Sequence, residues 1–314
     1  MTRLIDCSSP DLLRELMKNL TEGGKQSHRF ENFVMHNVST WILAGGFPKE
    51  TMSIYAFPAG KPLYIFMLDQ NDLYKPHLFV RTPIEGHNCE ILADGLKEII
   101  TVALPSIQQH GLLLLDADTV VRATFFKLQE TGEIPFKTKY TGEFYAFYMD
   151  ERQRRILTET ENRVPEGFKI DQIDVEKEYS IIHNAWAHAK NVPQEITRIK
   201  LANLPSVCIR DSDGNLASWQ MSTTFGQLTH LFTFERYRGA GIGYLAKNLL
   251  IQTYIKNGLQ VYAGVYVGNE KIATGGKKDS LWTLWKPTKN EGDENMLWSM
   301  TTFDYTKPKF SARL

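Results

Sequence analysis

The sequence predicts an α/β protein with mixed sheets, arranged as two successive lobes. Its 314 residues suffice for two domains of ordinary size, each with a buried core. Strand-like and helix-like patterns alternate in both halves, and one strand of the second half runs into a glycine-rich turn and a helix. Charged residues gather over 151–166, so we expect a linker there between domains 1–150 and 167–314. A charged surface helix inside one continuous domain explains that stretch equally well.

The first half begins with a helix and continues with short strands. Pro10 follows the N-cap candidate Ser9, and apolar residues then recur at helical spacing until Gly23. Apolar runs between Gly and Pro predict strands over 41–44, 53–57, 63–68 and 111–115, and a helical pattern over 91–104 ends at Pro105. This half contains no glycine-rich phosphate loop and no cluster of metal ligands in its sequence, which is typical of a scaffold.

The second half has a clear order of elements. Asp174 caps a helix whose apolar face is centred on Trp186, the pair Asp213-Gly214 marks a hairpin, and Gly258 ends a helix over 244–256. Strands are predicted over 168–173, 206–210, 216–221, 228–234 and 259–267, with aromatic strand-like segments over 281–285 and 296–303.

Composition restricts the partners. The chain has 36 basic and 36 acidic residues, so no net charge recruits nucleic acid or an anionic membrane. Its three cysteines are too few and too far apart for a disulfide framework or a zinc site, and no metal is expected. No run of eighteen apolar residues exists, and the acidic N-terminus predicts a cytoplasmic protein. A monomer is the default expectation.

The motif that carries chemistry is the turn between the strand at 228–234 and the following helix. Glycine allows positive φ and close approach of the backbone, so several N–H groups and the helix dipole can converge on a pyrophosphate. The residues are Arg238, Gly239, Ala240, Gly241, Ile242 and Gly243, the arginine being able to pair with a phosphate oxygen. A Rossmann site requires G-x-G-x-x-G and an acidic residue after the next strand, and both are missing. A glycine turn without a ligand is the remaining alternative.

The loop, its strand and its helix resemble motif A of the GCN5-related N-acetyltransferase (GNAT) superfamily, and within it the glycine N-acyltransferase family. The residues that carry the resemblance are His183 to Trp186, Ser206 to Cys208, Ser218-Trp219, Tyr237-Arg238, Val261-Tyr262 and Gly268 to Glu270. The similarity covers 168–281 well and is looser over 1–150. It implies a degenerate GNAT-like N-terminal lobe followed by a catalytic GNAT domain. It also implies transfer of an acyl group from acyl-CoA to the amine of glycine or another small amino acid.

The resemblance further implies where acyl-CoA binds. Pantetheine would lie between the strand before the loop and the strand after its helix, because these two strands splay apart in the superfamily. Freed backbone N–H groups near Phe232 and Phe234 would bind the thioester oxygen and the pantetheine amides. Tyr266 and Asn269 would face the thiol end of CoA. Asn269 can equally be only the N-cap of the next helix.

The general base is less clearly marked. The family pattern has a glutamate directly before Tyr-Arg, where this sequence has Arg236, and Glu235 stands one residue earlier. A shift by one residue turns a strand side chain to the other face unless a bulge restores it. His230 is the next candidate because its ordinary pKa is near neutrality. A packed histidine and a solvated glutamate are the alternative for these two residues, and water would then be the base.

Other residues have two interpretations each. Four aromatic residues are either pocket lining or core: Trp282, Trp285, Trp298 and Phe303. The segment 275–278, Gly-Gly-Lys-Lys, is either a contact for the CoA 3′-phosphate or a solvated loop, and Trp186 is expected in the core.

Family members are often mitochondrial, which is the alternative compartment. There are two alternative functions. One is acyl transfer to a different amine, and the other is CoA binding without catalysis.

Overall fold

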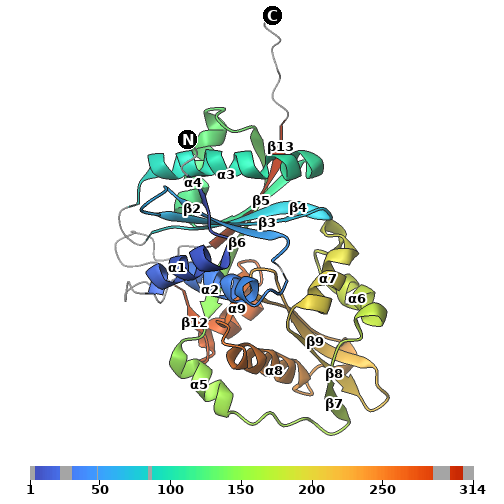
Figure 1. Ribbon diagram of the computed structural model, residues 1–314. Coiled ribbons are helices and arrows are strands. Elements are labelled where there is room, and N and C mark those ends of the chain that lie inside the picture. Colours follow the sequence, from blue (N-terminus) through green and yellow to red (C-terminus); the bar gives the residue numbers. More distant parts are fainter. Residues whose placement is uncertain (1–3, 22–29, 48, 84–86, 286–297, 307–314) are drawn as a thin grey trace, which may run out of the picture. The chain divides into compact units, whose positions relative to one another are not determined.

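The computed structural model describes residues 4–21, 30–47, 49–83, 87–285 and 298–306 (Figure 1). The chain forms two compact units, and both contain helices and sheets, as the sequence predicts. Unit 1 comprises Met1–Asn32, Lys49–Tyr145 and Lys286–Leu314, and unit 2 comprises Phe33–Pro48 and Ala146–Trp285. Neither unit is a single stretch of chain. The division into domains at 150 and 167 stays a prediction.

Unit 1 is built on a sheet with the strand order β1-β2-β3-β4-β5-β13-β6. The strands are β1 (Ile5–Asp6), β2 (Met52–Phe57), β3 (Tyr64–Asn71), β4 (Tyr74–Arg81), β5 (Leu112–Ala117), β6 (Phe136–Tyr148) and β13 (Trp298–Tyr305). β4 and β5 are parallel, as strands joined through a helix can be, and the other neighbours are antiparallel. β13 lies between β5 and β6 although it is far from both in sequence.

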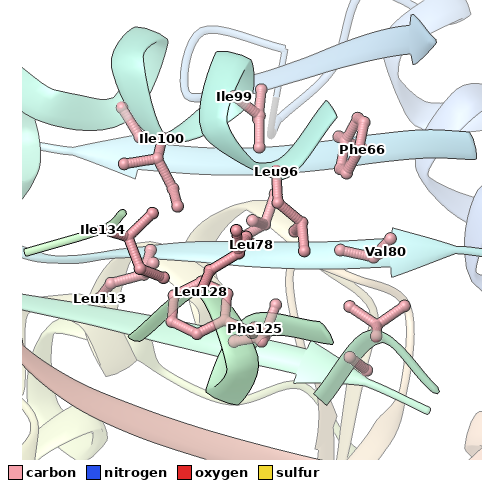
Figure 2. Packing of buried hydrophobic residues seen from close by; sticks show 14 of the residues in the cluster. Phe66, Leu78, Val80, Leu96, Ile99, Ile100, Leu113, Phe125, Leu128 and Ile134 are labelled. Atoms are coloured by element: carbon pink, nitrogen blue, oxygen red, sulfur yellow. The ribbon is translucent and has the colours of Figure 1, made fainter. Parts of the chain in front are cut away.

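The core of unit 1 lies between this sheet and two helices, α3 (Cys89–His110) and α4 (Thr119–Glu130). Figure 2 shows Leu96 of α3 and Phe125 of α4 packed with Leu78 of β4. α3 continues through Pro105, which we expected to end it. The reason is that its buried face extends to Ile107, so packing outweighs the hydrogen bond that proline cannot donate.

Two further helices belong to the first half, α1 (Pro10–Thr21) and α2 (Phe30–Leu43). α1 begins at the predicted proline, and Gly23 lies outside the described residues. The strand expected over 41–44 is wrong, because most of it is the last turn of α2. Val34, Val38 and Ile42 are buried at helical spacing, a pattern that a four-residue apolar run cannot reveal.

Unit 2 contains an antiparallel sheet with the order β10-β9-β8-β7. Its strands are β7 (Phe168–Asp171), β8 (Ser206–Asp211), β9 (Leu216–Ser222) and β10 (Leu228–Thr233), all close to the predicted ranges. Two other strands, β11 (Tyr262–Tyr266) and β12 (Thr283–Leu284), are hydrogen-bonded to β6. The helices are α5 (Glu151–Glu159), α6 (Val175–Asn184), α7 (Gln194–Asn203), α8 (Ile242–Lys256) and α9 (Glu270–Lys278). α7 was not predicted, and α5 occupies most of the expected linker.

Helices cover both faces of the four-stranded sheet (Figure 1). α8 packs on one face, where Val207 and Ile209 of β8 point, and α6 and α7 pack on the other, where Cys208 and Trp219 point. Successive side chains of β8 point to opposite faces of the sheet. One row of apolar side chains therefore lies under α8, and the other lies under α6 and α7.

A buried ion pair holds β7, β8 and α6 together. Arg210 donates to both carboxylate oxygens of Glu178 at 2.5 and 2.8 Å and to Asp171 at 3.0 Å. The side chains of Arg210 and Glu178 are only 10% and 11% exposed. Removal of Arg210 therefore leaves the Glu178 carboxylate buried and uncompensated.

The variant Arg210→Met is expected to lower the free energy of unfolding by about 3 kcal/mol, because Glu178 stays buried as an unpaired carboxylate. Urea unfolding measures the change. Arg198→Met is the matched control, since Arg198 pairs with Glu195 at a site where the side chains are 35% and 40% exposed, and it should change stability by about 0.5 kcal/mol or less. Equal effects of the two variants would contradict a special role for the buried pair.

Candidate functional site

The predicted glycine turn joins β10 to α8 through a short 3₁₀ turn and the loop residues 238–241. Gly239 and Gly241 have φ of +87° and +78°, and a Cβ built at either would meet nothing within 4 Å. The space in front of both glycines is therefore open. Gly243 differs, because its Cβ would come within 2.8 Å of Thr233 Oγ1. Two glycines shape the turn, and the third lets α8 pack closely on β10.

The N-terminus of α8 lacks a side-chain cap. Gly241 occupies the N-cap position in a left-handed conformation, and no described side chain accepts a hydrogen bond there. The N–H groups of Ile242, Gly243 and Tyr244 belong to the first turn and have no intrahelical acceptors. Together with the helix dipole, these donors form a site for an anion beside the two open glycines.

Unit 1 contains a comparable strand–turn–helix, from β4 to α3, and there the helix N-terminus is occupied by the protein itself. Asn88 Oδ1 accepts hydrogen bonds from the N–H groups of Glu90 and Ile91 at 2.9 and 3.0 Å. Glu90 adds a negative charge to the first turn. Of these two helix starts in the described structure, the one at Gly241 is open to an external anion.

The open turn is fastened to the β8–β9 hairpin. The Tyr237 hydroxyl donates a short hydrogen bond to Asp211, and Asn215 donates a second. These two bonds lower the pKa of Asp211 to about 2. The Arg236 guanidinium lies over the Tyr237 ring, 4.6 Å from its centroid. Arg236, which stands where the family has a glutamate, thus helps to clamp the turn.

The strands β10 and β11 begin side by side but do not pair. Asn37 Nδ2 donates to the carbonyls of Gly226 and Gln260 at 3.2 and 2.9 Å, and Asn37 Oδ1 accepts from the Gln260 N–H at 2.7 Å. The Tyr262 hydroxyl also donates to the Phe225 carbonyl. Beyond these hydrogen bonds, β10 and β11 belong to different sheets. All residues of the two strands are described, and each strand lies at the edge of its sheet. The absence of a ladder between them agrees with the expected splayed strands.

A bulge decides which backbone groups of β10 face this open edge. The register with β9 shifts between Thr229 and Phe232. Beyond the shift, the Phe234 N–H donates to the Ala217 carbonyl at 3.1 Å, and the Phe232 carbonyl accepts from Ser218 Oγ at 2.8 Å. Residues 232 and 234 therefore direct their polar groups toward β9. The expectation that these two residues offer free N–H groups needs correction.

The backbone groups of residues 231 and 233, which alternate with 232 and 234, point away from β9. Backbone direction alternates along an antiparallel strand, so Leu231 and Thr233 present their N–H and carbonyl groups at the open edge. The Thr233 carbonyl indeed accepts from Arg238 Nε at 3.2 Å and not from β9. The extra residue of the bulge has moved the alternation by one position, which the sequence did not show.

His230 lies at the bulge with a φ of +53°, which is unusual for a residue with a side chain. Its Nδ1 is buried and has no hydrogen-bond partner among the described residues, and its ring packs on Trp186 at 4.4 Å between centroids. Burial lowers the pKa of His230 to about 3, and the nearby side chains of Lys200, His183 and His188 contribute in the same direction. The ring is therefore neutral at physiological pH.

Glu235 is the first residue of the 3₁₀ turn that follows β10. Its side chain is exposed, and its carbonyl accepts the N–H of Arg238 at 3.1 Å. β10 ends at Thr233, so Glu235 lies outside the strand. Of the two base candidates, His230 is the one that lies within β10.

The residues expected at the thiol end lie at the end of β11 and the start of α9. Asn269 is the N-cap of α9, with Oδ1 accepting from the Ile272 N–H at 3.5 Å. Its own N–H donates to the Tyr266 carbonyl at 2.8 Å. Tyr266 is 47% exposed, and its ring lies against Gly268, where a Cβ would come within 2.6 Å. The capping role of Asn269 is therefore present.

Several other candidates take structural roles. Phe303 is fully buried in the core of unit 1, and Trp298 stacks on Phe79 there at 4.9 Å between centroids. Trp285 is buried, Trp282 packs on the core of unit 2, and segment 275–278 is the end of α9 and not a loop. Trp186 lies beyond α6 and is half-buried, so the expected helical core position is wrong. The segment 296–303 is described from Trp298 onward.

Comparison with solved structures settles the fold. No family model matches the sequence, and no curated protein matches it. A Drosophila protein of known structure superposes with a TM-score of 0.70 at 13% identity, over 96% of this chain and 98% of that chain. A tandem GNAT protein from the clavulanic acid biosynthesis pathway superposes with a TM-score of 0.56 at 13% identity, over 95% and 97% of the two chains. The chain has a GNAT fold. That the open turn before α8 corresponds to motif A stays a prediction.

The GNAT fold of this chain contains no described helix long and apolar enough to cross a membrane. Within the described residues, no three His, Cys, Asp or Glu side chains are grouped closely enough to hold a metal ion.

Proposed function

We propose that the chain is an acyl-CoA-dependent N-acyltransferase that transfers an acyl group to the amine of glycine or another small amino acid. The observation that carries the proposal is the uncapped start of α8 behind two glycines with positive φ, next to the unpaired edges of β10 and β11. The first feature suits a pyrophosphate, and the second suits the amides of pantetheine. Both lie in unit 2.

Within this proposal, Gly239 to Gly243 bind the pyrophosphate through backbone N–H groups, and Arg238 supplies a positive charge. The backbone N–H groups of Leu231 and Thr233 take the role first expected of Phe232 and Phe234. An N–H group at this edge would donate to the thioester oxygen, where negative charge develops as the amine attacks. Tyr266 would contact the thiol end of CoA, with Asn269 holding the helix beside it.

His230 is the proposed base. The amine nitrogen attacks the thioester carbonyl carbon, the carbon–sulfur bond breaks, and CoA leaves as a thiolate. Neutral His230 accepts the proton that the amine loses, through the Nδ1 atom that has no partner in the described structure. A neutral ring with pKa about 3 is a weak base by itself. A bound carboxylate would raise that pKa, because an anion beside the ring favours its protonated form.

The same electrostatics favours an amino acid as acceptor. The side chains that lower the pKa of His230 in addition to burial are Lys200, His183 and His188, all of basic type. A substrate carboxylate would therefore meet favourable charge close to the base, whereas a polyamine would be repelled. That the protein is a cytoplasmic monomer stays a prediction.

The test is release of free CoA thiol by the purified protein with a panel of acyl-CoAs, from acetyl to benzoyl, with and without each common amino acid. Release that depends on an amino acid is the expected result, and it names both substrates. Release that depends instead on amines without a carboxylate would contradict the acceptor class. Binding of CoA without turnover by any pair would contradict the catalytic assignment and leave a CoA-binding protein.

A further inference from the structure

We propose that Cys89, His87 and Tyr64 form a reactive thiol site in unit 1, at which Cys89 exchanges with low-molecular-weight disulfides to give a reversible mixed disulfide. The site is separate from the elements that carry the proposed acyl transfer, and it does not depend on that function. It rests on a contrast among the three cysteines and on the hydrogen bonds of one histidine.

The three cysteines of the chain differ in accessibility. Cys7 and Cys208 are buried, and Cys89 is exposed. Burial raises the pKa of the Cys7 thiol and raises that of Cys208 to about 12. The reacting form of cysteine is the thiolate, so these two side chains are inert to a reagent in solution. Cys89 is the one that a disulfide can reach.

Cys89 has an imidazole beside its sulfur. Its Sγ lies 3.6 Å from His87 Nε2, and His87 Nδ1 lies 2.9 Å from the hydroxyl oxygen of Tyr64. The hydroxyl has one proton, which it donates to the Asn88 carbonyl at 2.9 Å. It must therefore accept from His87, which places the ring proton on Nδ1. The Nε2 lone pair then faces the thiol and can accept its proton.

The arrangement is held in place by packing and capping. Tyr64 is fully buried, and its oxygen also accepts the Asn88 N–H at 2.9 Å. Its ring meets that of His87 edge to face at 5.7 Å between centroids. Asn88 caps α3, of which Cys89 is the first of 22 residues.

These groups together provide a nucleophile, a base and a residue that orients the base. His87 Nε2 takes the thiol proton, and the thiolate attacks one sulfur of the disulfide. The disulfide bond breaks, a new bond joins Cys89 to the attacked half, and the other half leaves as a thiolate that takes the proton from His87. Cys89 is oxidised and the leaving half is reduced to a thiol. Because Cys7 and Cys208 are buried, no second thiol of the described chain is available to displace the adduct, which persists until an external thiol reduces it.

The test uses the full-length protein with glutathione disulfide at pH 7, followed by intact-mass and peptide mass spectrometry. We expect one adduct, on Cys89, reversed by dithiothreitol and absent in Cys89→Ser. His87→Gln should slow its formation at least tenfold. His110→Gln, at the other end of the same helix, is the control and should leave the rate unchanged. Circular dichroism shows whether each variant is folded.

Two results would overturn the proposal. Equal rates for the wild type and a folded His87→Gln variant would show that the imidazole does not act on the thiol. Adducts on Cys7 or Cys208 at the rate of Cys89 would show that burial does not distinguish the three cysteines. Neither result bears on acyl transfer, since the residues tested all lie outside the elements assigned to it.

Discussion

The variant Gly241→Asp is expected to abolish detectable binding of CoA, with a loss of at least a hundredfold in affinity. Gly241 has a φ of +78° and open space where a Cβ would stand. A carboxylate at this position would enter the space assigned to the pyrophosphate and would repel it. It would also cap the N–H groups of the first turn of α8, which are the proposed phosphate donors. Isothermal titration of the protein with CoA measures the effect.

Gly258→Asp is the matched control for this variant. Gly258 follows the other end of α8, has a φ of +71°, and also has open space at its Cβ position. Both substitutions place the same residue in a left-handed conformation, which costs roughly 1 kcal/mol in each case. Gly258→Asp should lower the unfolding temperature at least as much as Gly241→Asp, because a carboxylate is favourable only at the N-terminus of α8, whereas only Gly241→Asp should lose CoA. Unchanged affinity in Gly241→Asp would overturn the assignment of the turn.

The same titration should give one CoA for each chain. The equivalent helix start in unit 1 is capped by Asn88 and carries Glu90 in its first turn, so its N–H groups are already bonded and its charge is unfavourable for a phosphate. A second CoA of comparable affinity would contradict this comparison of the two units.

The glycine turn could be predicted from the sequence because its information is local. Gly239, Gly241 and Gly243 follow a strand and open a helix, and a residue with positive φ at a helix start is nearly always glycine. The hairpin at Gly214 and the end of α8 at Gly258 were predictable for the same reason. In each case the amino acid itself restricts the backbone.

The geometry around the turn could not be predicted, because it depends on contacts distant in sequence. Asn37, in a helix, ties the starts of β10 and β11 across sequence separations of 189 and 223 residues. The insertion of β13 between β5 and β6 likewise leaves no local mark. The bulge at His230 has the largest consequence. Because of it, the backbone groups of residues 231 and 233 face the open edge, and those of 232 and 234 face β9. Histidine is not a residue that signals positive φ.

The conformation of His230 also bears on function. A residue with a side chain seldom adopts positive φ unless its surroundings require it, and such positions gather at functional sites. Here the residue with positive φ also has a buried Nδ1 without a hydrogen-bond partner among the described residues. A packed histidine with no role would be expected to find a hydrogen-bond partner.

The variant His230→Asn is expected to lower kcat between about 100-fold and 10,000-fold, the range for loss of a general base, with little change in KM for acyl-CoA. Asparagine tolerates positive φ better than most residues, so the strand should keep its bulge. His230→Gly offers the same backbone freedom without a polar side chain. Activity close to that of the wild type in both folded variants would leave water as the base.

The pH dependence gives a second readout. With a pKa of about 3, His230 binds a proton in only about one per cent of native molecules at pH 5, so the free-enzyme profile should show no imidazole ionisation near 6.5. The unfolded chain does take up this proton below pH 6.5, so burial of the neutral ring lowers stability as pH falls from 6.5 toward 3. Between pH 7 and pH 5 the loss amounts to about 2 kcal/mol.

His230→Asn removes that loss, because asparagine does not titrate. The variant should therefore lose about 2 kcal/mol less unfolding free energy than the wild type when urea unfolding at pH 7 is compared with that at pH 5. A wild-type protein that is equally stable at both pH values would show that His230 is not buried as a neutral ring. That result would remove the electrostatic argument for His230 as the base.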